Sequence, residues 1–460
     1  KVKFILLYIK FLFCYHTIMP DNIMVASNAM EKIVSLCKRR GFVFQNSEIY
    51  GGVNGIWDLG PLGVALANNI KKEWWESMVL SRDDVVGLDS SILSHPKVWK
   101  ASGHVKSFVD PLIECKICHE RFRSDHKKEI EEHAMVHAKT EWTDVKHFNL
   151  MFKTFLGPIE DDKNKTYLRP ETAQGIFINF ENVLATTRIK IPFGIAQIGR
   201  GFRNEITTGN FLFRVREFEM MELEFFTEPG KDSKWFDYWR KERLKWYLNL
   251  GIKKENIKLV DLPKEDIAHY SKGTSEIWYN WPFMGFGELE GIANRGDYDL
   301  TQHSKFSEKE LSYFDEESKK RFIPYVIEPS VGVGRAMLAF LIDAYIEEED
   351  RIVLKLHPKL SPIKAAVFPL LANKLPLAKM ARDIYDNLKK SIKDSIAFDD
   401  RGNIGKRYYS QDEIGTPFCI TVDFQSLEDD TVTVRDRDTM KQDRVKVNNL
   451  VSYIQRIINK

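Results

Sequence analysis

Hydrophobic and polar residues alternate along two neighbouring stretches in the middle of the chain, residues 195–205 and 215–226. A period of two is typical of β-strands, and the polar residues between the stretches predict the loop of a hairpin. The same period places Arg203 and Glu205 on one strand face, and Glu222 with its second neighbour Glu224 on another. Such charges are also common on a sheet face that is exposed to solvent. For any single pair, a place on an exposed face and a place in a functional site are therefore both open.

A third stretch begins as a strand and continues as a buried helix. Residues 322–327 are β-branched or aromatic apart from Pro324, Gly332 and Gly334 interrupt the run, and Arg335 opens the apolar segment 336–342. A cation at a helix N-terminus is disfavoured by the helix dipole, whereas a bound phosphate would gain both the backbone N–H groups and the guanidinium. The glycines alone are a weak signal, since they lack the third glycine of a dinucleotide fingerprint and the Lys-Ser/Thr of a P-loop.

Elsewhere the pattern predicts two helices near the start of the chain and a separate domain near its end. Residues 26–40 are expected to form a helix, and residues 57–78 a turn and an amphipathic helix. Prolines mark residues 351–362 as a linker. The alternating segments that follow argue for a compact α/β domain of about 100 residues. These segments are 364–368, a helix ending near residue 390, 396–398, 405–409, 418–422 and 431–435.

The composition agrees with a large intracellular enzyme. The chain has 460 residues, of which 43% are hydrophobic, which is ample for the cores of two or three domains. Its formal charge of +2 gives no strong global field, so any RNA contact must come from local basic patches. Five cysteines, an odd number, argue against a disulfide scaffold and for a reducing compartment.

The first residues are an apolar run with three alternative origins. Residues 1–16 are interrupted by Lys10 and are shorter than the roughly 20 apolar residues of a membrane span. They are a targeting signal, an interfacial helix or translated upstream sequence. A transit peptide would be richer in Arg and Ser. We favour upstream sequence, with the start at Met19 or Met24, which makes residues 1–23 a doubtful extension.

A short segment carries the ligands of a metal site. Its spacing is C-x2-C-x14-H-x3-H, which suits tetrahedral Zn²⁺ in a structural role, because four protein ligands leave no open position. A charged helical insertion with exposed histidines is the alternative. The four predicted ligands are Cys115, Cys118, His133 and His137, and other nearby donors are His119, His126 and His147.

The hairpin with Phe-Arg-Asn-Glu at 202–205 and the helix start at 332–335 resemble motifs 2 and 3 of the class II aminoacyl-tRNA synthetases. Residues 59–63, which lead into the helix 64–78, are a candidate for motif 1. Three further motifs resemble those of the dimeric glycyl-tRNA synthetases, and the similarity runs from about Met24 to the C-terminus. These motifs are residues 169–175, 287–295 and 328–330.

This resemblance implies an α+β fold, with a catalytic domain built on an antiparallel sheet and a C-terminal α/β domain that binds the anticodon. The expected limits are 24–350 for the catalytic core, with an insertion at 110–145, and 357–460 for the anticodon-binding domain. The implied enzyme is a cytoplasmic homodimer, not bound to a membrane, whose subunits meet through residues 57–78. It uses ATP and Mg²⁺ to convert glycine to glycyl-adenylate and passes glycine to the 3′ end of tRNA(Gly). In the family a Cys-x-x-Cys pair in the insertion is common, whereas the histidine pair is less regular.

The resemblance also assigns the nucleotide site. Arg203 would hold the α-phosphate and the glycine carboxylate, and together with Arg335 it is the expected catalytic residue. Arg214 and Arg335 would bind the γ-phosphate, Glu205 the adenine amino group, and Glu288 with Mg²⁺ would organise the phosphates. Phe218 would stack on adenine. The full expected ATP-binding set is Arg203, Asn204, Glu205, Phe213, Arg214, Val215, Arg216, Glu217, Phe218, Glu288, Leu289, Gly332, Val333, Gly334 and Arg335.

For glycine, the resemblance implies an ammonium site of three carboxylates, Glu171, Glu222 and Glu328. Clustered carboxylates repel one another when the site is empty, which raises at least one pKa, and a tight pocket rejects alanine by a clash. Strand parity alone does not choose between Glu219 and Glu222, and the resemblance favours Glu222. At Glu171, a favourable carboxylate at a helix start is the alternative role. The full expected set is Glu171, Phe218, Glu219, Met220, Met221, Glu222, Arg295, Glu328, Pro329, Ser330, Val331 and Gly332.

Two other classes of protein share this fold. An accessory subunit of a DNA polymerase would bind nucleic acid without catalysis, and would have lost the arginines and glutamates that are present here. An amino-acid ligase similar to asparagine synthetase would lack the C-terminal α/β domain. The sequence therefore favours the glycyl-tRNA synthetase hypothesis.

Overall fold

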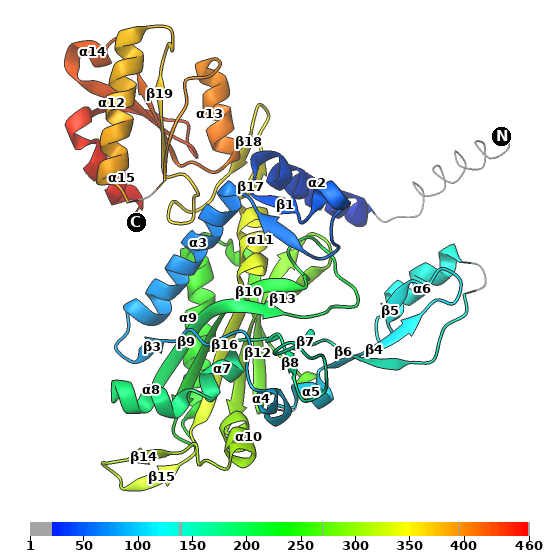
Figure 1. Ribbon diagram of the computed structural model, residues 1–460. Helices are drawn as coiled ribbons and strands as arrows, with labels where there is room; N and C mark the ends of the chain where they lie inside the picture. Colours follow the sequence, from blue (N-terminus) through cyan, green and yellow to red (C-terminus); the bar gives the residue numbers. More distant parts are fainter. Residues whose placement is uncertain (1–20, 138–139, 269, 394, 459–460) are drawn as a thin grey trace, which may run out of the picture.

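The computed structural model describes residues 21–137, 140–268, 270–393 and 395–458. Most of the doubtful extension, residues 1–20, lies outside the described residues. The chain forms a large domain around a seven-stranded sheet and a smaller C-terminal domain, which lies above it in Figure 1. Within the described part of the chain, no helix combines the length and apolarity needed to cross a bilayer.

The large sheet has the strand order β11-β12-β13-β16-β10-β9-β3 and is antiparallel except for the β3–β9 pair at one edge. The predicted hairpin is present, but its first strand ends at Phe202. Arg203 and Glu205 therefore lie beyond the strand, and the prediction that alternation orients them is wrong. The strands are β3 (Val85–Gly87), β9 (Phe193–Phe202), β10 (Glu217–Thr227), β11 (Ile257–Asp261), β12 (Gly273–Trp281), β13 (Gly285–Gly296) and β16 (Tyr325–Gly332).

Helices pack on both faces of this sheet. On one face, Met221, Leu223 and Phe225 of β10 join a core with the helices α3 (Pro61–Trp75), α9 (Asp232–Asn249) and α11 (Val333–Ala344). On the other face, Phe226 joins a second core with α7 (Ala173–Phe177), α8 (Phe180–Thr187) and α10 (Tyr298–Ser307). Because side chains alternate along a strand, Glu222 and Glu224 lie on this second face with Phe226. The two glutamates are almost completely buried there.

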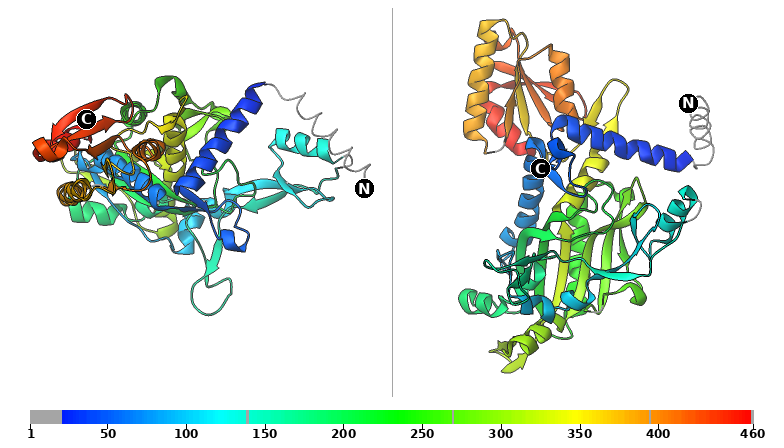
Figure 2. Two further views of the ribbon diagram at one scale, coloured as in Figure 1. Left: turned by 90° about the horizontal axis from the view of Figure 1, so that it is seen from above. Right: turned by 45° about the vertical axis from the view of Figure 1, so that its right-hand side comes forward.

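The predicted N-terminal helix is α2 (Asp21–Arg40), and the segment predicted as a turn and helix contains β2 (Trp57–Leu59) followed by α3. The insertion stands out from the sheet domain in both views of Figure 2. Its sheet has the order β5-β4-β6, and a helix follows β5. These elements are β4 (Val109–Glu114), β5 (Arg121–Arg123), α6 (Lys127–Val136) and β6 (Lys146–Asn149). The remaining short elements are β1 (Val43–Gln45), α4 (Pro96–Ala101), α5 (His104–Ser107), β7 (Lys153–Phe155), β8 (Lys165–Tyr167), β14 (Tyr313–Asp315), β15 (Lys320–Phe322), β17 (Tyr345–Glu347) and β18 (Ile352–Leu354).

The C-terminal domain is the predicted α/β unit, with the strand order β20-β19-β21-β22-β23. Segment 405–409 of the predicted alternation belongs to α13. Glu413 at the end of that helix accepts hydrogen bonds from Arg39 and Arg40 of α2, and so joins the two domains. The elements are β19 (Ala365–Pro369), α12 (Leu375–Ser391), β20 (Ile396–Phe398), α13 (Ile404–Glu413), β21 (Phe418–Val422), α14 (Ser426–Asp429), β22 (Thr431–Asp436), β23 (Gln442–Lys446) and α15 (Leu450–Ile458).

Candidate active site

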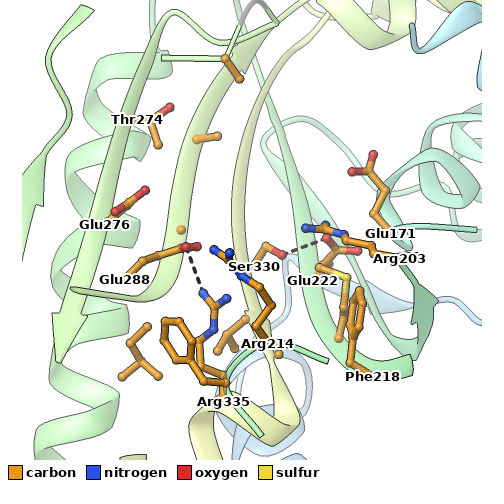
Figure 3. Close-up of a pocket in the computed structure, with 18 of the residues that line it drawn as sticks. Glu171, Arg203, Arg214, Phe218, Glu222, Thr274, Glu276, Glu288, Ser330 and Arg335 are labelled. Atoms are coloured by element: carbon orange, nitrogen blue, oxygen red, sulfur yellow. Dashed lines mark hydrogen bonds and ion pairs between the residues drawn. The ribbon is translucent and has the colours of Figure 1, made fainter. Parts of the chain in front are cut away.

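A cavity of about 510 Å³ lies on the sheet, lined by β10, β13, β16, the loop after β9 and the start of α11. Its walls bring together most of the residues expected from the sequence. Figure 3 shows arginines and glutamates at both ends: Arg335 and Arg214 lie near Glu288, and Arg203 lies near Glu171 and Glu222. From the expected sets the cavity gathers Glu171, Arg203, Glu205, Phe213, Arg214, Val215, Phe218, Met220, Glu222, Glu288, Leu289, Glu328, Ser330, Val331, Gly332, Gly334 and Arg335.

Arg335 and Glu288 form an ion pair at one end of the cavity, with 3.0 Å between Nη1 and Oε2. The Arg335 guanidinium also lies over the ring of Phe213, 4.5 Å from its centroid. Arg335 holds the pKa of Glu288 below its usual range, although burial acts in the other direction. The dipole of α11 disfavours the positive charge of Arg335 at its N-terminus. Glu288 offsets that charge, in the position where a bound phosphate would do the same.

Glu276 of β12 lines the same end of the cavity as Glu288. Burial raises the pKa of Glu276, and the charge of Glu288 raises it further. Two carboxylates on neighbouring strands at one end of a nucleotide-sized cavity suit Mg²⁺, which binds one or two protein carboxylates together with substrate phosphates. The donors present therefore fit the expected magnesium ion.

Arg203 lies in the middle of the cavity wall, between two aromatic rings. Its guanidinium is 5.4 Å from the centroid of Phe218 and 5.5 Å from that of Phe108. Its Nε donates to the carbonyl oxygen of Pro170 at 3.1 Å, which fixes the direction of the side chain. Burial raises the pKa of the neighbouring Glu205, while the charges of Arg203 and Arg214 lower it.

Glu222 is held by the start of α7. Its Oε2 accepts from the backbone N–H of Thr172 at 2.6 Å, from that of Ala173 at 3.1 Å and from the Thr172 hydroxyl. Its Oε1 accepts from the Ser330 hydroxyl at 2.8 Å. Burial raises the pKa of Glu222, and the nearby charge of Glu171 adds to that effect.

Glu328 is held by an arginine that lies behind the cavity wall. Nη1 of Arg295 is 2.9 Å from both carboxylate oxygens of Glu328, and its Nε and Nη2 donate to Asp299 at 2.7 and 2.9 Å. Burial raises the pKa of Glu328 to about 7, with Arg295 opposing and Glu222 and Glu171 reinforcing the shift. The expected repulsion among clustered carboxylates acts in this direction, second to burial.

Glu171 has the opposite electrostatic balance. Burial acts to raise its pKa, but His104, Arg295 and a hydrogen bond from Gln174 hold that pKa well below its usual range. The three glutamates therefore form a buried acidic cluster in which Glu171 carries charge and its neighbours favour a proton.

Several expected site residues lie outside the cavity lining. Glu219 and Met221 are on the other face of β10, where Glu219 pairs with Lys71 of α3 at 3.0 Å. Glu217 pairs with Arg200 on the neighbouring strand. Arg295 contacts the cluster from behind. The others that do not line the cavity are Asn204, Arg216, Pro329 and Val333.

The structure also adds residues that the sequence analysis did not select. Thr172 and Gln174 fall inside the motif 169–175, so that motif was a signal for them. Asp110 and Arg123 of the insertion line the cavity and pair at 2.9 Å, and His104 contacts Glu171 at 3.3 Å. The spacing of these three residues carries no signal, because they meet the site only through the tertiary fold.

The insertion brings three of its four predicted metal ligands together. The ligand atoms of Cys115, Cys118 and His133 all lie within 4.8 Å of one another. Glu120 is 3.1 Å from Nδ1 of His133, which leaves Nε2 facing Cys118 at 3.5 Å. The His137 ring lies 4.6 Å from that of His133, centroid to centroid. Two thiolates and an imidazole oriented by a carboxylate fit Zn²⁺.

Two of the alternative donors in the insertion are engaged elsewhere. His119 pairs with Glu114 and His126 with Glu129, each at 3.1 Å. These contacts favour the cysteine pair and His133 as the core of the candidate metal site.

Comparisons with known proteins agree with this geometry. Residues 152–345 match a family described as the tRNA synthetase class II core domain (G, H, P, S and T), and residues 364–457 match the anticodon binding domain. A glycine–tRNA ligase of Thermobifida fusca is 53% identical over 454 residues, covering 93% of this chain and 98% of that protein. One of Streptomyces coelicolor is 53% identical over 456 residues, covering 94% and 98%.

Among solved structures, a prolyl-tRNA synthetase from Cryptosporidium parvum matches with a TM-score of 0.66 and 15% identity. The match covers 93% of this chain and 75% of that one, and it shows the shared fold. The sequence relatives, unlike this distant structure, also show the family. The chain belongs to the glycine–tRNA ligase family of class II tRNA synthetases.

Proposed function

We propose that the cavity activates glycine with ATP and that the enzyme then transfers glycine to tRNA(Gly). The observation that carries this proposal is the acidic cluster of Glu171, Glu222 and Glu328, which lies in one cavity with Arg203 and Arg335. An ammonium ion neutralises such a cluster, and a triphosphate neutralises the arginines. Amino acid and nucleotide are thus bound side by side.

The protein's part in the first step is placement and charge. The glycine carboxylate attacks the α-phosphorus of ATP, a bond forms between them, and pyrophosphate leaves. Arg203 is placed to bind the α-phosphate and the attacking carboxylate, and Arg214 and Arg335 to bind the outer phosphates. Glu276 and Glu288 would hold Mg²⁺, which neutralises phosphate charge when it is bound. On binding ATP, Arg335 exchanges its contact with Glu288 for one with phosphate.

Selection of glycine depends on the ammonium group and on exclusion of side chains. Glycine offers no side chain, so binding has to come from its two charged groups. An ammonium ion entering the acidic cluster removes the repulsion among the three carboxylates. A pocket closed around the α-carbon imposes a clash on alanine, which discriminates more strongly than the loss of a contact.

The remaining assignments concern the whole protein. We place the catalytic core at 24–350 and the anticodon-binding domain at 357–460. The active form is a homodimer in the cytoplasm, joined through the segment 57–78. Zn²⁺ on Cys115, Cys118, His133 and His137 is structural and keeps the insertion folded. Elemental analysis of metal-replete protein tests that assignment, and a zinc content of zero would exclude it.

Amino-acid-dependent exchange of pyrophosphate into ATP, measured with all twenty amino acids, tests the function. Glycine alone should support exchange, and Glu171→Gln should abolish it while the fold stays intact. Charging of tRNA(Gly) is the second measurement. Exchange without charging would indicate an amino-acid ligase that uses no tRNA, and absence of exchange would refute the enzyme proposal.

A further inference from the structure

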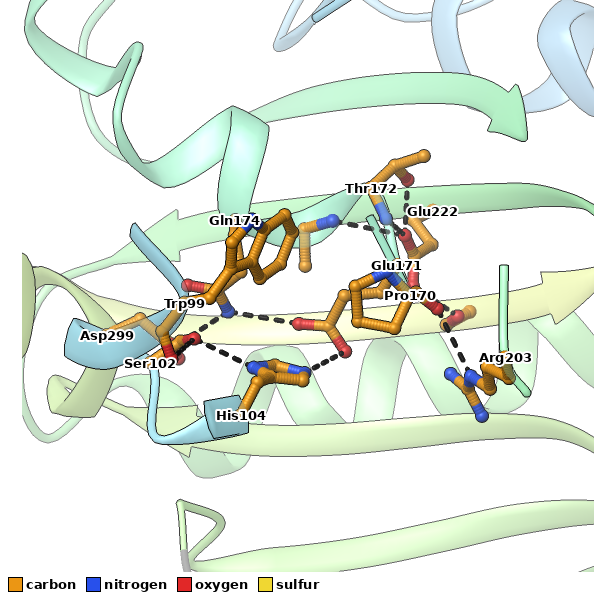
Figure 4. Close-up of polar contacts among 12 residues, drawn as sticks. Trp99, Ser102, His104, Pro170, Glu171, Thr172, Gln174, Arg203, Glu222 and Asp299 are labelled. Carbon is orange, nitrogen blue, oxygen red and sulfur yellow. Dashed lines mark hydrogen bonds and ion pairs between the residues drawn. The ribbon is translucent and has the colours of Figure 1, made fainter. Parts of the chain in front are cut away.

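A chain of buried polar contacts reaches Glu171 from behind the cavity (Figure 4). Nε2 of His104, in the short helix α5, lies 3.3 Å from Oε2 of Glu171. Nδ1 of the same ring lies 2.7 Å from the hydroxyl of Ser102. His104 is 8% exposed and Ser102 is 4% exposed, so water does not compete for these contacts.

The acceptors around His104 fix which nitrogen carries the proton. A carboxylate only accepts, so Nε2 must carry a hydrogen and donate it to Glu171. The contact between Nδ1 and the Ser102 hydroxyl holds the ring in place. Through Nε2, His104 orients Glu171.

This Ser–His–Glu arrangement resembles a catalytic triad, but its geometry opposes a nucleophilic role for Ser102. Neither Ser102 nor His104 is among the residues that line the cavity. Phe108, which does line it, lies against the His104 ring at 5.3 Å between centroids, and Trp99 packs on the same ring at 5.6 Å. The serine hydroxyl is therefore shielded from the substrate, and the contacts act on Glu171 alone.

The three glutamates of the acidic cluster are held in different ways. Glu222 is fixed by backbone N–H groups and hydroxyls, and Glu328 by the charged Arg295. On Glu171, Oε1 accepts from Gln174 at 3.0 Å, and Oε2 faces His104. One N–H of His104 orients the carboxylate, and the lowered pKa of Glu171 leaves that carboxylate ionised to bind a cation.

We propose that His104 is a positioning residue for glycine, which aims the Glu171 carboxylate at the substrate ammonium group. The proposal rests on the proposed function, in which Glu171 binds that ammonium. Since the ammonium is not consumed in the reaction, the contact should act on glycine binding in the ground state and in the transition state alike. Its loss should therefore raise KM for glycine and leave kcat and KM for ATP nearly unchanged.

Glycine-dependent pyrophosphate exchange, measured with full-length His104→Phe and His104→Gln, tests this proposal. Phenylalanine keeps the ring volume but has no donor, so KM for glycine should rise about 10- to 100-fold. Glutamine keeps an N–H donor and should stay within about fivefold of wild type. His95→Gln is the matched control, because His95 caps α4 and accepts from the backbone N–H of Lys97.

The outcomes separate a failure of the positioning role of His104 from a failure of the proposed function. A wild-type KM for glycine in His104→Phe would overturn the proposal, as would equal losses in KM for ATP and kcat. If His104→Phe does not fold, as judged by its melting temperature, Ser102→Ala decides. That variant should raise KM for glycine about threefold, and an unchanged KM overturns the proposal. Wild-type enzyme without glycine-dependent exchange would instead refute the proposed function itself.

Discussion

The enzyme's affinity for glycine is expected to rise with pH up to about neutrality, because binding must release a proton from the acidic cluster. Burial and the charges of Glu222 and Glu171 raise the pKa of Glu328 from 4.5 to about 7. The pKa of Glu171 is lowered, so Glu171 stays ionised throughout this range. An ammonium ion favours the ionised form of Glu328, and below about pH 7 the proton must leave before that form exists.

The size of this pH effect follows from the shift in the pKa of Glu328. One pKa unit corresponds to about 1.4 kcal/mol, so ionising Glu328 in the empty site costs about 3 kcal/mol. The carboxyl group of Glu328 holds its proton more tightly in the native state than in the unfolded state. The free energy of unfolding without glycine should therefore fall by about that amount as pH rises from about 4.5 to about 7, and then level off. Over the same window the dissociation constant for glycine should fall by up to about tenfold per pH unit.

The assay is KM for glycine in pyrophosphate exchange, measured from about pH 5.5 to about pH 8.5. Its logarithm should fall with pH and become flat above about 7. KM for ATP, taken from the same experiments, controls for titration of the nucleotide. Thermal unfolding with and without glycine gives the independent stability measurement.

Glu328→Gln is the matched variant, since Arg295 keeps its two bonds to Asp299. It should bind glycine more weakly above pH 7 and show a flatter pH profile than wild type. The reasoning fails if wild-type KM for glycine is constant or rises over the acidic half of the range. It also fails if Glu328→Gln retains the full wild-type slope.

Three further predictions concern other parts of the molecule. Arg335→Ala should lower kcat for exchange about 10²- to 10³-fold without unfolding the protein, and a wild-type rate would refute its phosphate role. Glu413→Gln should weaken the junction between the domains and lower tRNA charging, while exchange stays at the wild-type rate; equal loss in both assays would contradict this. Gly63→Ala should cost about 1–3 kcal/mol in unfolding free energy, because its new Cβ would lie 1.8 Å from the Phe42 carbonyl oxygen. Gly405→Ala is the control, since its new Cβ would meet only Oδ1 of Asn403 at an ordinary contact distance of 3.7 Å, and it should melt at or above the wild-type temperature.

The local pattern of the sequence predicted the elements that have a strong period or sharp boundaries. The hairpin of β9 and β10, the helix α11 and the C-terminal α/β domain all follow from alternation, glycine breaks and apolar runs. A short segment of the pattern did not reveal its type. Segment 405–409 is helical, and five residues do not separate a buried helix from a strand.

The faces of the strands were predicted only in part. Parity correctly put Glu219 and Glu222 on opposite sides of β10, but it did not say which side holds the cavity. The packing of α3 and α11 on one face decided that, and Lys71 of α3 pairs with Glu219 there. For Arg203 parity failed, because the strand ends one residue earlier and the loop sets the direction of the side chain.

The sequence by itself determined the chemical types that the site would need, arginines for phosphate and carboxylates for an ammonium ion, and the motifs that carry them. The tertiary structure alone decided how the charges are balanced. Arg295 holds Glu328, a helix start holds Glu222, and His104 orients Glu171. These partners come from segments far apart in the chain. Burial and distance set their pKa values, and a linear pattern contains neither quantity.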